Sequence, residues 1–279
     1  MGVVVIVIRK TSITIIGSKD VLYELYENVK QYIYKPLGKK CAYSGRGNLH
    51  VILDEDSPGF LYLLEMSKTL NLHPHITQWV GYTKSEKENA DFYEMSIPSP
   101  LELEGTDAGD YGTQYIGGCP HCGLGRKPVS DVLVDRKFIK KYHIGSLYPE
   151  IFVSEFVKEL ICSNDLSGTL FKHEVKDYKG REMSKYFCIE ISNILPLMSS
   201  TAWLIQEDSH RYKDCGDNVI YLRSDCQYER KKLANAQDFN LTYEYIDNFR
   251  ERKIIVSEKV RKLFQSNKLY VAFTPVAII

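Results

Sequence analysis

The sequence has no excess of charge of either sign. Lysine and arginine together number 36, as do aspartate and glutamate, so the formal net charge at pH 7 is zero. A chain without net positive charge has no overall field that would draw it to DNA, RNA or an anionic membrane. Two short basic runs, at residues 136–141 and 250–253, lie near acidic residues and are interpreted as solvated faces. We therefore expect no membrane partner, and nucleic acid is disfavoured.

The sequence also lacks a hydrophobic run that would span a membrane near its start. The apolar stretch at residues 3–8 is far shorter than the ~20 residues that a membrane helix needs, and no basic residue precedes it. We interpret it as a buried strand and not as a signal peptide. Without a secretion signal, the seven cysteines are expected to be reduced, as metal ligands or small buried side chains. The expected location is therefore a bacterial cytoplasm.

Signature motifs of common enzyme classes are missing. The sequence has no glycine-rich phosphate loop, no nucleophile elbow and no HExxH motif. The nearest approach to a catalytic set is His73 and His75 before one predicted strand, with Asp54 and Asp56 after another, which together would suit a metal-dependent hydrolase. No third motif completes this set, so we interpret both groups as polar loops. The balance favours a protein that is not an enzyme.

The hydrophobic pattern predicts an α+β fold in two domains. At 279 residues and 44% hydrophobic content, the chain can bury a substantial core. Residues 1–110 are expected to form a mixed sheet with helices on one face. The predicted strands are 3–8, 13–16, 49–53, 75–82 and 92–97, and the predicted helices are 20–34 and 60–70. Residues 98–118 are rich in glycine, proline and acids, and are expected to lead into the second domain, residues 111–279.

The second domain contains an internal repeat. Residues 151–166 match residues 254–269 at nine of sixteen positions without a gap. In each copy a β-branched strand leads into a serine N-cap, Ser154 or Ser257, and a glutamate follows. We therefore predict two related strand–helix–strand units, at about 151–171 and 254–273, in pseudo-twofold packing. The competing interpretation is that one local solution to helix capping arose twice by chance.

A Cys-Pro-His-Cys-Gly run at residues 119–123 resembles half of a zinc site. Two cysteines three positions apart, with proline between them and glycine after them, direct both thiolates into one tetrahedral corner. The region from His210 to Cys226 offers the remaining ligands. The predicted structural zinc site consists of Cys119, Cys122, Cys215 and Cys226, with His210 as an alternative fourth ligand. A redox dithiol and an inert pair of cysteines are the alternatives.

These motifs, taken in order, resemble the double-CxxCG-motif proteins known from myxobacteria and other bacteria. The resemblance covers roughly residues 117–279 and rests on the CPHCG knuckle, the later Cys215-Gly216, and the terminal pattern from Phe249 to Val276. More loosely, the chain is similar to immunity proteins of polymorphic toxin systems. It departs from the family pattern at Tyr212, which stands where the first cysteine of the second CxxCG would be. The resemblance implies an accessory or immunity-like role in bacteria, and it supplies no established catalytic activity to carry over.

Two functional hypotheses follow. The first is a non-enzymatic, immunity-like bacterial binding protein whose partner is another protein, such as a toxin domain, and whose zinc is structural. The 20 tyrosines favour this hypothesis, because tyrosine brings contact area at low entropic cost. The second is a zinc-knuckle module that acts on or near nucleic acid, as an enzyme of unknown type.

Overall fold

The protein is described here from a computed structural model, and its chain forms two compact units. The first unit comprises Met1–Glu86 with the short segments Ala202–Leu204 and Arg223–Asp225, and the second comprises the other residues. Residue 110, the boundary that the sequence predicts, lies outside the described residues. The structure describes residues 9–33, 47–54, 56–80, 82–97, 115–117, 127–128, 132–134, 143–147, 150–177, 179–200, 202, 204–207, 219–222, 225–246 and 252–279. Within these ranges, no helix combines the length and apolar character needed to cross a membrane.

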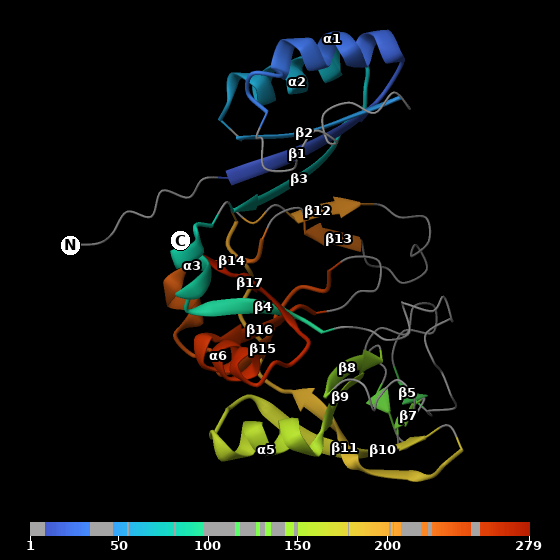
Figure 1. Cartoon of the computed structure of the whole chain (residues 1–279), viewed down its shortest axis with the longest axis vertical. Coiled ribbons are helices and arrows are strands. Elements are labelled where there is room, and N and C mark those ends of the chain that lie inside the picture. The colour runs from blue at the N-terminus through green and yellow to red at the C-terminus, as the bar shows by residue number, and fades with distance from the viewer. Residues whose placement is uncertain are drawn as a thin grey trace, which may run out of the picture. The chain divides into compact units, whose positions relative to one another are not determined.

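In the first unit, two helices cover one face of a three-stranded antiparallel sheet (Figure 1). The elements are β1 (Arg9–Ile16), α1 (Lys19–Val29), β2 (Asn48–Asp54), α2 (Pro58–Thr69) and β3 (His75–Val80). Alternate residues of β1 and β2 face the helices, and the core consists of Ile13, Ile15, Leu22, Leu25, Val29, Leu49, Val51, Leu53, Phe60 and Leu63. The helices lie on one face as predicted. The described sheet is antiparallel and not mixed, because β1 lies between β2 and β3 and runs opposite to both. The expected strand at residues 3–8 lies outside the described residues.

Strand β4 (Phe92–Ser96) forms where the sequence predicts it but joins a different sheet. It pairs with two strands from the C-terminal end of the chain, β16 and β17, and runs antiparallel to both. The prediction that this strand belongs to the N-terminal sheet is therefore wrong. A period-two pattern determines that a segment is extended, but it does not determine which strand lies beside it.

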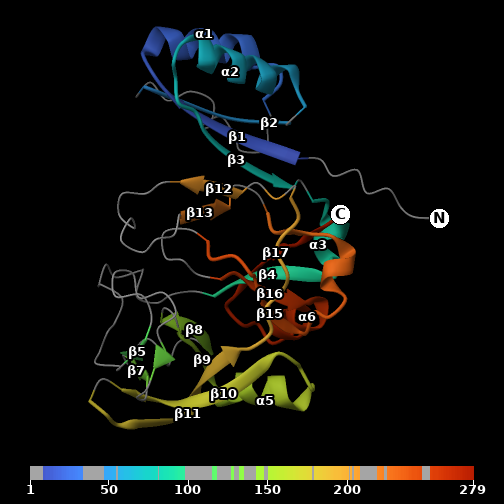
Figure 2. The same ribbon diagram turned by 180° about the vertical axis from the view of Figure 1, so that it is seen from behind.

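The second unit combines several sheets (Figure 2). A five-stranded sheet has the order β7-β10-β11-β9-β8, a four-stranded sheet has the order β15-β16-β4-β17, and three pairs are β5-β6, β12-β13 and β14-β18. The remaining elements are α3 (Lys84–Glu88) at the boundary of the units, β5 (Tyr115–Ile116), β6 (Lys127–Pro128), β7 (Val132–Val134), β8 (Ile144–Leu147), β9 (Glu150–Ser154), α5 (Glu155–Ser163), β10 (Thr169–Asp177), β11 (Glu182–Ile191), β12 (Leu204–Glu207), β13 (Val219–Leu222), β14 (Gln227–Tyr228), the 3₁₀ helix η3 (Arg230–Leu233), β15 (Phe239–Leu241), β16 (Ile254–Ser257), α6 (Glu258–Ser266), β17 (Ala272–Pro275) and β18 (Ala277–Ile278).

Both predicted strand–helix–strand units are present: β9–α5–β10, called the first repeat, and β16–α6–β17, called the second repeat. Each pair of outer strands encloses a central antiparallel strand, which is β11 in the first repeat and β4 in the second. Ser154 and Ser257 each accept a hydrogen bond from the backbone N–H three residues later, at 3.4 Å. Val157 and Val260 are fully buried, whereas Leu160 and Leu263 are partly buried against the same core. The two serine caps are thus confirmed.

Each of these helices ends in a left-handed residue that is not glycine. Among the described residues, positive φ outside glycine occurs at Asp165 (49°), Lys268 (55°) and Asn71 (52°), which follow α5, α6 and α2. In each case the next residue is a leucine whose N–H donates to the carbonyl five residues earlier. This is the hydrogen bond that closes a helix end with a left-handed residue. The β2–α2–β3 segment encloses β1 in the same way, so the arrangement occurs in both units.

Candidate functional site

Of the predicted zinc ligands, the structure describes Cys226 alone. Cys119, Cys122, Cys215 and the alternative His210 lie outside the described residues. Cys226 directly precedes β14, is 1% exposed, and its thiol donates to the Glu94 Oε2 atom at 3.5 Å. No group of three or more His, Cys, Asp or Glu side chains within the described ranges is placed to hold a metal ion. The zinc site therefore stays a prediction, with one buried thiol as its described member.

Cys226 belongs to a set of polar residues that we call the buried polar cluster: Ser199, Cys226, Tyr228 and Glu244, which are buried, and Glu94, which is partly exposed. Glu94 lies in the middle of β4, where its neighbours Tyr93 and Met95 face the core and Glu94 faces the other side of the sheet. Cys226 and Tyr228 are two residues apart on an extended segment, so their side chains share a face. Lys253 approaches this face, with its Nζ atom 3.9 Å from Glu94 Oε1.

Glu244 is held in the cluster by the neighbouring chain segment. It is 3% exposed, and its Oε1 atom accepts a hydrogen bond from the Met198 N–H at 2.7 Å. The Thr242 hydroxyl donates to the Glu244 carbonyl at 2.8 Å, which fixes the local turn. Ser199, next to Met198, donates its N–H to the Gln227 carbonyl at 2.8 Å and so links this segment to β14.

The cluster keeps Tyr228 protonated. Burial raises the pKa of the Tyr228 phenol far above its ordinary value, and the charges of Cys226, Glu244 and Glu94 raise it further. The Tyr228 hydroxyl has no hydrogen-bond partner in the described structure. A neutral phenol in this place is suited to bind or orient a group and not to act as a base.

Exposed side chains occur on the two segments that meet at Glu244: Ile194 and Leu197 on one, and Tyr243 and Tyr245 on the other. Together with the half-buried Arg252, which lies near both tyrosine rings, we call them the Tyr–Arg surface. The guanidinium carbon of Arg252 lies 4.4 Å from the ring centroid of Tyr245 and 6.0 Å from that of Tyr243. Residues 193–198 run beside residues 241–244, through a bridge between Ile194 and Leu241 and the Met198–Glu244 hydrogen bond. Side chains from two segments thereby form one surface.

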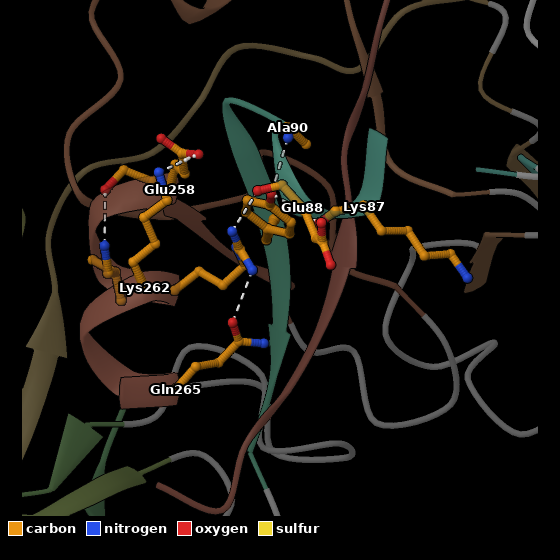
Figure 3. A network of polar contacts seen from close by, with 10 residues as sticks. Lys87, Glu88, Ala90, Glu258, Lys262 and Gln265 are labelled. Atoms are coloured by element: carbon orange, nitrogen blue, oxygen red, sulfur yellow. Dashed lines mark hydrogen bonds and ion pairs between the residues drawn. The ribbon is translucent and has the colours of Figure 1, made fainter. Parts of the chain in front are cut away.

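A second network surrounds Arg261 on α6 (Figure 3). Its guanidinium carbon lies 4.7 Å from the Tyr93 ring centroid, and its Nη2 atom donates to the Glu88 carbonyl at 2.5 Å. The Tyr93 hydroxyl donates to the Lys87 carbonyl at 3.1 Å and accepts from the Ala90 N–H at 2.9 Å. Arg261 and Tyr93 therefore satisfy carbonyl groups at the C-terminal end of α3. This network is structural, because its groups bind one another and the backbone.

The histidines and carboxylates considered for a hydrolase do not meet. Asp54 is in register with Lys10 on β1, whereas His75 is in register with Thr14, four residues further along that strand. His73 and Asp56 lie in the exposed turns next to these strands. Asp54 and His75 lie within β2 and β3, so the interpretation as polar loops holds for Asp56 and His73 and not for these two.

A scan against protein-family models finds no match to the chain, and a search of the curated proteins finds no significant match. The resemblance to double-CxxCG-motif proteins therefore stays a prediction. Sequence reasoning missed Glu94, Tyr228 and Glu244, because no short motif joins residues so far apart in the chain. The one signal was the glutamate between Tyr93 and Met95, a charged side chain in an otherwise apolar strand.

Proposed function

We propose that the protein is a non-enzymatic, immunity-like binding protein whose partner is another protein. The Tyr–Arg surface carries this proposal. Tyr243 is 54% exposed and Tyr245 37%, and they flank the inward-facing Glu244. Tyrosine and arginine are enriched among the residues that dominate the binding energy of protein interfaces.

Hydrogen bonds hold the two chain segments that carry the Tyr–Arg surface, which favours binding by a largely preformed site. Glu244 ties residues 241–246 to the backbone of Met198, and Lys232 donates to the carbonyls of Leu197 and Met198 at 3.0 and 3.2 Å. Stacking on Arg252 restricts both tyrosine rings. Side chains that are ordered before binding lose less entropy when a partner arrives.

The interaction is tested with the product of the neighbouring gene, which this proposal expects to be a toxin with a variable C-terminal domain. We expect Tyr245→Ala or Arg252→Ala to weaken binding in isothermal titration calorimetry by about 2 kcal/mol or more, the loss typical of an interface anchor. Tyr23→Ala is the matched control, since Tyr23 is 55% exposed on α1 of the first unit. Alanine at His73, His75, Asp54 or Asp56 is expected to leave binding unchanged. If these four variants lose function while folded, and the surface variants do not, an enzymatic role replaces this proposal.

We propose in addition that Cys119, Cys122, Cys215 and Cys226 hold one structural zinc. The chemistry of Cys226 suits this role, because it is a buried thiol beside a carboxylate that can accept its proton. Bound zinc would supply folding energy and no catalysis. Untagged protein is expected to contain about one zinc per chain, and chelation is expected to unfold the second unit. The zinc proposal would be contradicted if the protein contained less than half an equivalent of zinc and a chelator did not lower its stability.

We also propose that the two repeats derive from one duplicated unit. Sequence identity at nine of sixteen positions supports this origin. So do the shared strand order and the left-handed residue at the same point after each helix.

A further inference from the structure

Arg252 differs from the other arginines whose side chains the structure describes. Each of the others binds a polar side chain: Arg181 binds Asp177, Arg230 binds Asp91 and Arg261 binds Gln265. Arg252 is half-buried, and its contacts within the described part of the chain are one backbone carbonyl and two tyrosine rings. Its guanidinium therefore has no carboxylate partner among the described residues.

The backbone that carries Arg252 is fixed by its pairing with Thr242. The Thr242 N–H donates to the Lys253 carbonyl at 3.0 Å, and the Lys253 N–H donates to the Thr242 hydroxyl at 3.0 Å. These two bonds continue the antiparallel register of β15 and β16 by one residue beyond the pair of Leu241 and Ile254. The next position of this register brings Arg252 beside Tyr243. Thr242 is fully buried, so its pairing with Lys253 is shielded from water.

The guanidinium of Arg252 is held from two sides. Its Nη1 atom donates to the Thr242 carbonyl at 3.2 Å. Its guanidinium carbon lies 4.4 Å from the ring centroid of Tyr245 and 6.0 Å from that of Tyr243. A guanidinium has five N–H donors, and an aromatic ring at its face leaves them able to form hydrogen bonds. One of the five is used within the described residues, so the others are available to a ligand.

A half-buried guanidinium without a counter-ion is a binding site for an anion. Arginine stays charged in proteins, and partial burial strengthens its attraction to an opposite charge. Lys253, the next residue, provides the contrast, because its Nζ atom lies 3.9 Å from Glu94 Oε1. Of these two successive cations, Lys253 alone has a carboxylate partner in the described part of the chain.

We propose that Arg252, flanked by Tyr243 and Tyr245, binds an aspartate or glutamate side chain of the protein partner. This inference rests on the proposed function and names the chemistry that the partner presents. A carboxylate matches two parallel N–H groups of a guanidinium. Its single negative charge balances the one cation, whereas a phosphate group would bring nearly two. The tyrosine rings would shield this pair from water, as the surroundings of an interface hot spot do.

The site is tested by NMR with two probes, a capped leucine–glutamate–leucine peptide and its glutamine counterpart. The two peptides differ in one charge and hardly in shape. The Arg252 Nε–Hε signal is expected to shift saturably with the glutamate peptide, with a Kd on the order of 1 mM, and to stay in place with the glutamine peptide. Arg230 is the internal control, because its side chain is 76% exposed and already paired with Asp91. Its signal is expected to remain unchanged.

Two variants separate the charge of Arg252 from its geometry, with the ring signals of Tyr245 as the readout. Arg252→Gln is expected to abolish the saturable response. Arg252→Lys is expected to weaken binding of the glutamate peptide by roughly tenfold, because an ammonium group does not bind both carboxylate oxygens in one plane. Equal shifts with both peptides in the wild-type protein, a comparison that needs no variant to fold, would overturn the proposal. So would equal binding of the glutamate peptide by the wild type and Arg252→Gln.

Failure of this inference is distinguishable from failure of the proposed function. Selective binding of the glutamate peptide, without binding of the neighbouring gene's product, would support the carboxylate site and reject that partner. Binding of this product that requires Tyr245 but tolerates Arg252→Gln, with no peptide selectivity, would keep the proposed function and overturn the carboxylate site.

Discussion

The two repeats agree on the side of the sheet that faces their helices and differ on the opposite side. In the first repeat, Phe187 and Phe171 meet edge to face at 6.4 Å, and in the second Tyr93 and Phe273 do so at 6.3 Å. A cation from the helix lies over the aromatic residue of the central strand in each repeat: the Lys158 Nζ atom is 3.7 Å from the Phe187 centroid, and the Arg261 guanidinium carbon is 4.7 Å from the Tyr93 centroid.

On the opposite side, Cys188 in the first repeat corresponds to Glu94 in the second. Packing against the helix tolerates little change in volume, so that side is constrained by the core. The opposite side is also buried, at Phe152 and Cys188 in the first repeat and at Ile255 in the second, yet it holds side chains of different polarity. The two repeats therefore differ in the residue at this place, a cysteine in the first and a glutamate in the second.

The largest contrast is expected between the two helix cations. Arg261 is buried, bonds a carbonyl and a glutamine, and lies over an aromatic ring, whereas Lys158 lies over two aromatic rings within the described part of the chain. Arg261→Ala should therefore lower the free energy of unfolding by about 3 kcal/mol, and Lys158→Ala by about 1 kcal/mol. Urea denaturation followed by circular dichroism measures both. If both variants lost the same free energy of unfolding, the hydrogen bonds of Arg261 would add nothing to the aromatic packing that the two repeats share.

The serine caps should show a smaller contrast. Ser154→Ala and Ser257→Ala are each expected to destabilise by about 1 kcal/mol, with the greater loss at Ser257. The Ser257 hydroxyl also donates to Asp238 Oδ1 at 2.7 Å, whereas the Ser154 hydroxyl contacts His143 Nδ1 at 3.0 Å. Urea denaturation of both variants measures which cap contributes more, with Ser192→Ala, at an exposed residue, as the control. A greater loss at Ser154 would reverse the ranking.

The smallest expected effect is on the loss of stability at low pH, to which Asp238 contributes. Burial alone would raise the pKa of Asp238, but hydrogen bonds from Ser167 and Ser257 outweigh it and hold this pKa below its ordinary value. A lowered pKa in the folded state gives stability that is present above the unfolded pKa and is lost as pH falls through the folded one. Tm measured from pH 6 down to pH 3 is expected to fall less steeply in Asp238→Asn. Parallel curves for the variant and the wild type would show that Asp238 contributes no acid sensitivity.

Local structure followed closely from the sequence. The serine caps, helices α2, α5 and α6, and strands β2 and β4 formed where hydrophobic period and capping residues predict them. These features depend on interactions within a few residues. Helix α1 ends at Val29, short of the predicted end at Tyr34, because side-chain periodicity marks a helix end only approximately.

Partners between distant segments could not be predicted in this way. β4 is an ordinary apolar strand in sequence, and only the assembled sheet shows that it completes the second repeat. Left-handed Asp165 and Lys268 carry no glycine signal, since the helix end imposes their conformation. The buried polar cluster likewise depends on β4, because Glu94 faces Cys226 only after that strand is in place.

The position of β4 in the chain sets an order for folding during synthesis. The first repeat is contiguous, so its central strand follows at once and the sheet closes locally. β4 leaves the ribosome before the first repeat, and its neighbour β17 ends at Pro275, roughly 180 residues later. At about 5 to 20 residues per second, the strand waits for about 10 to 40 s with unpaired backbone. During that interval the edges of β4 lack the partner strands that pair with them in the finished sheet, and an unpaired strand edge is open to wrong pairing.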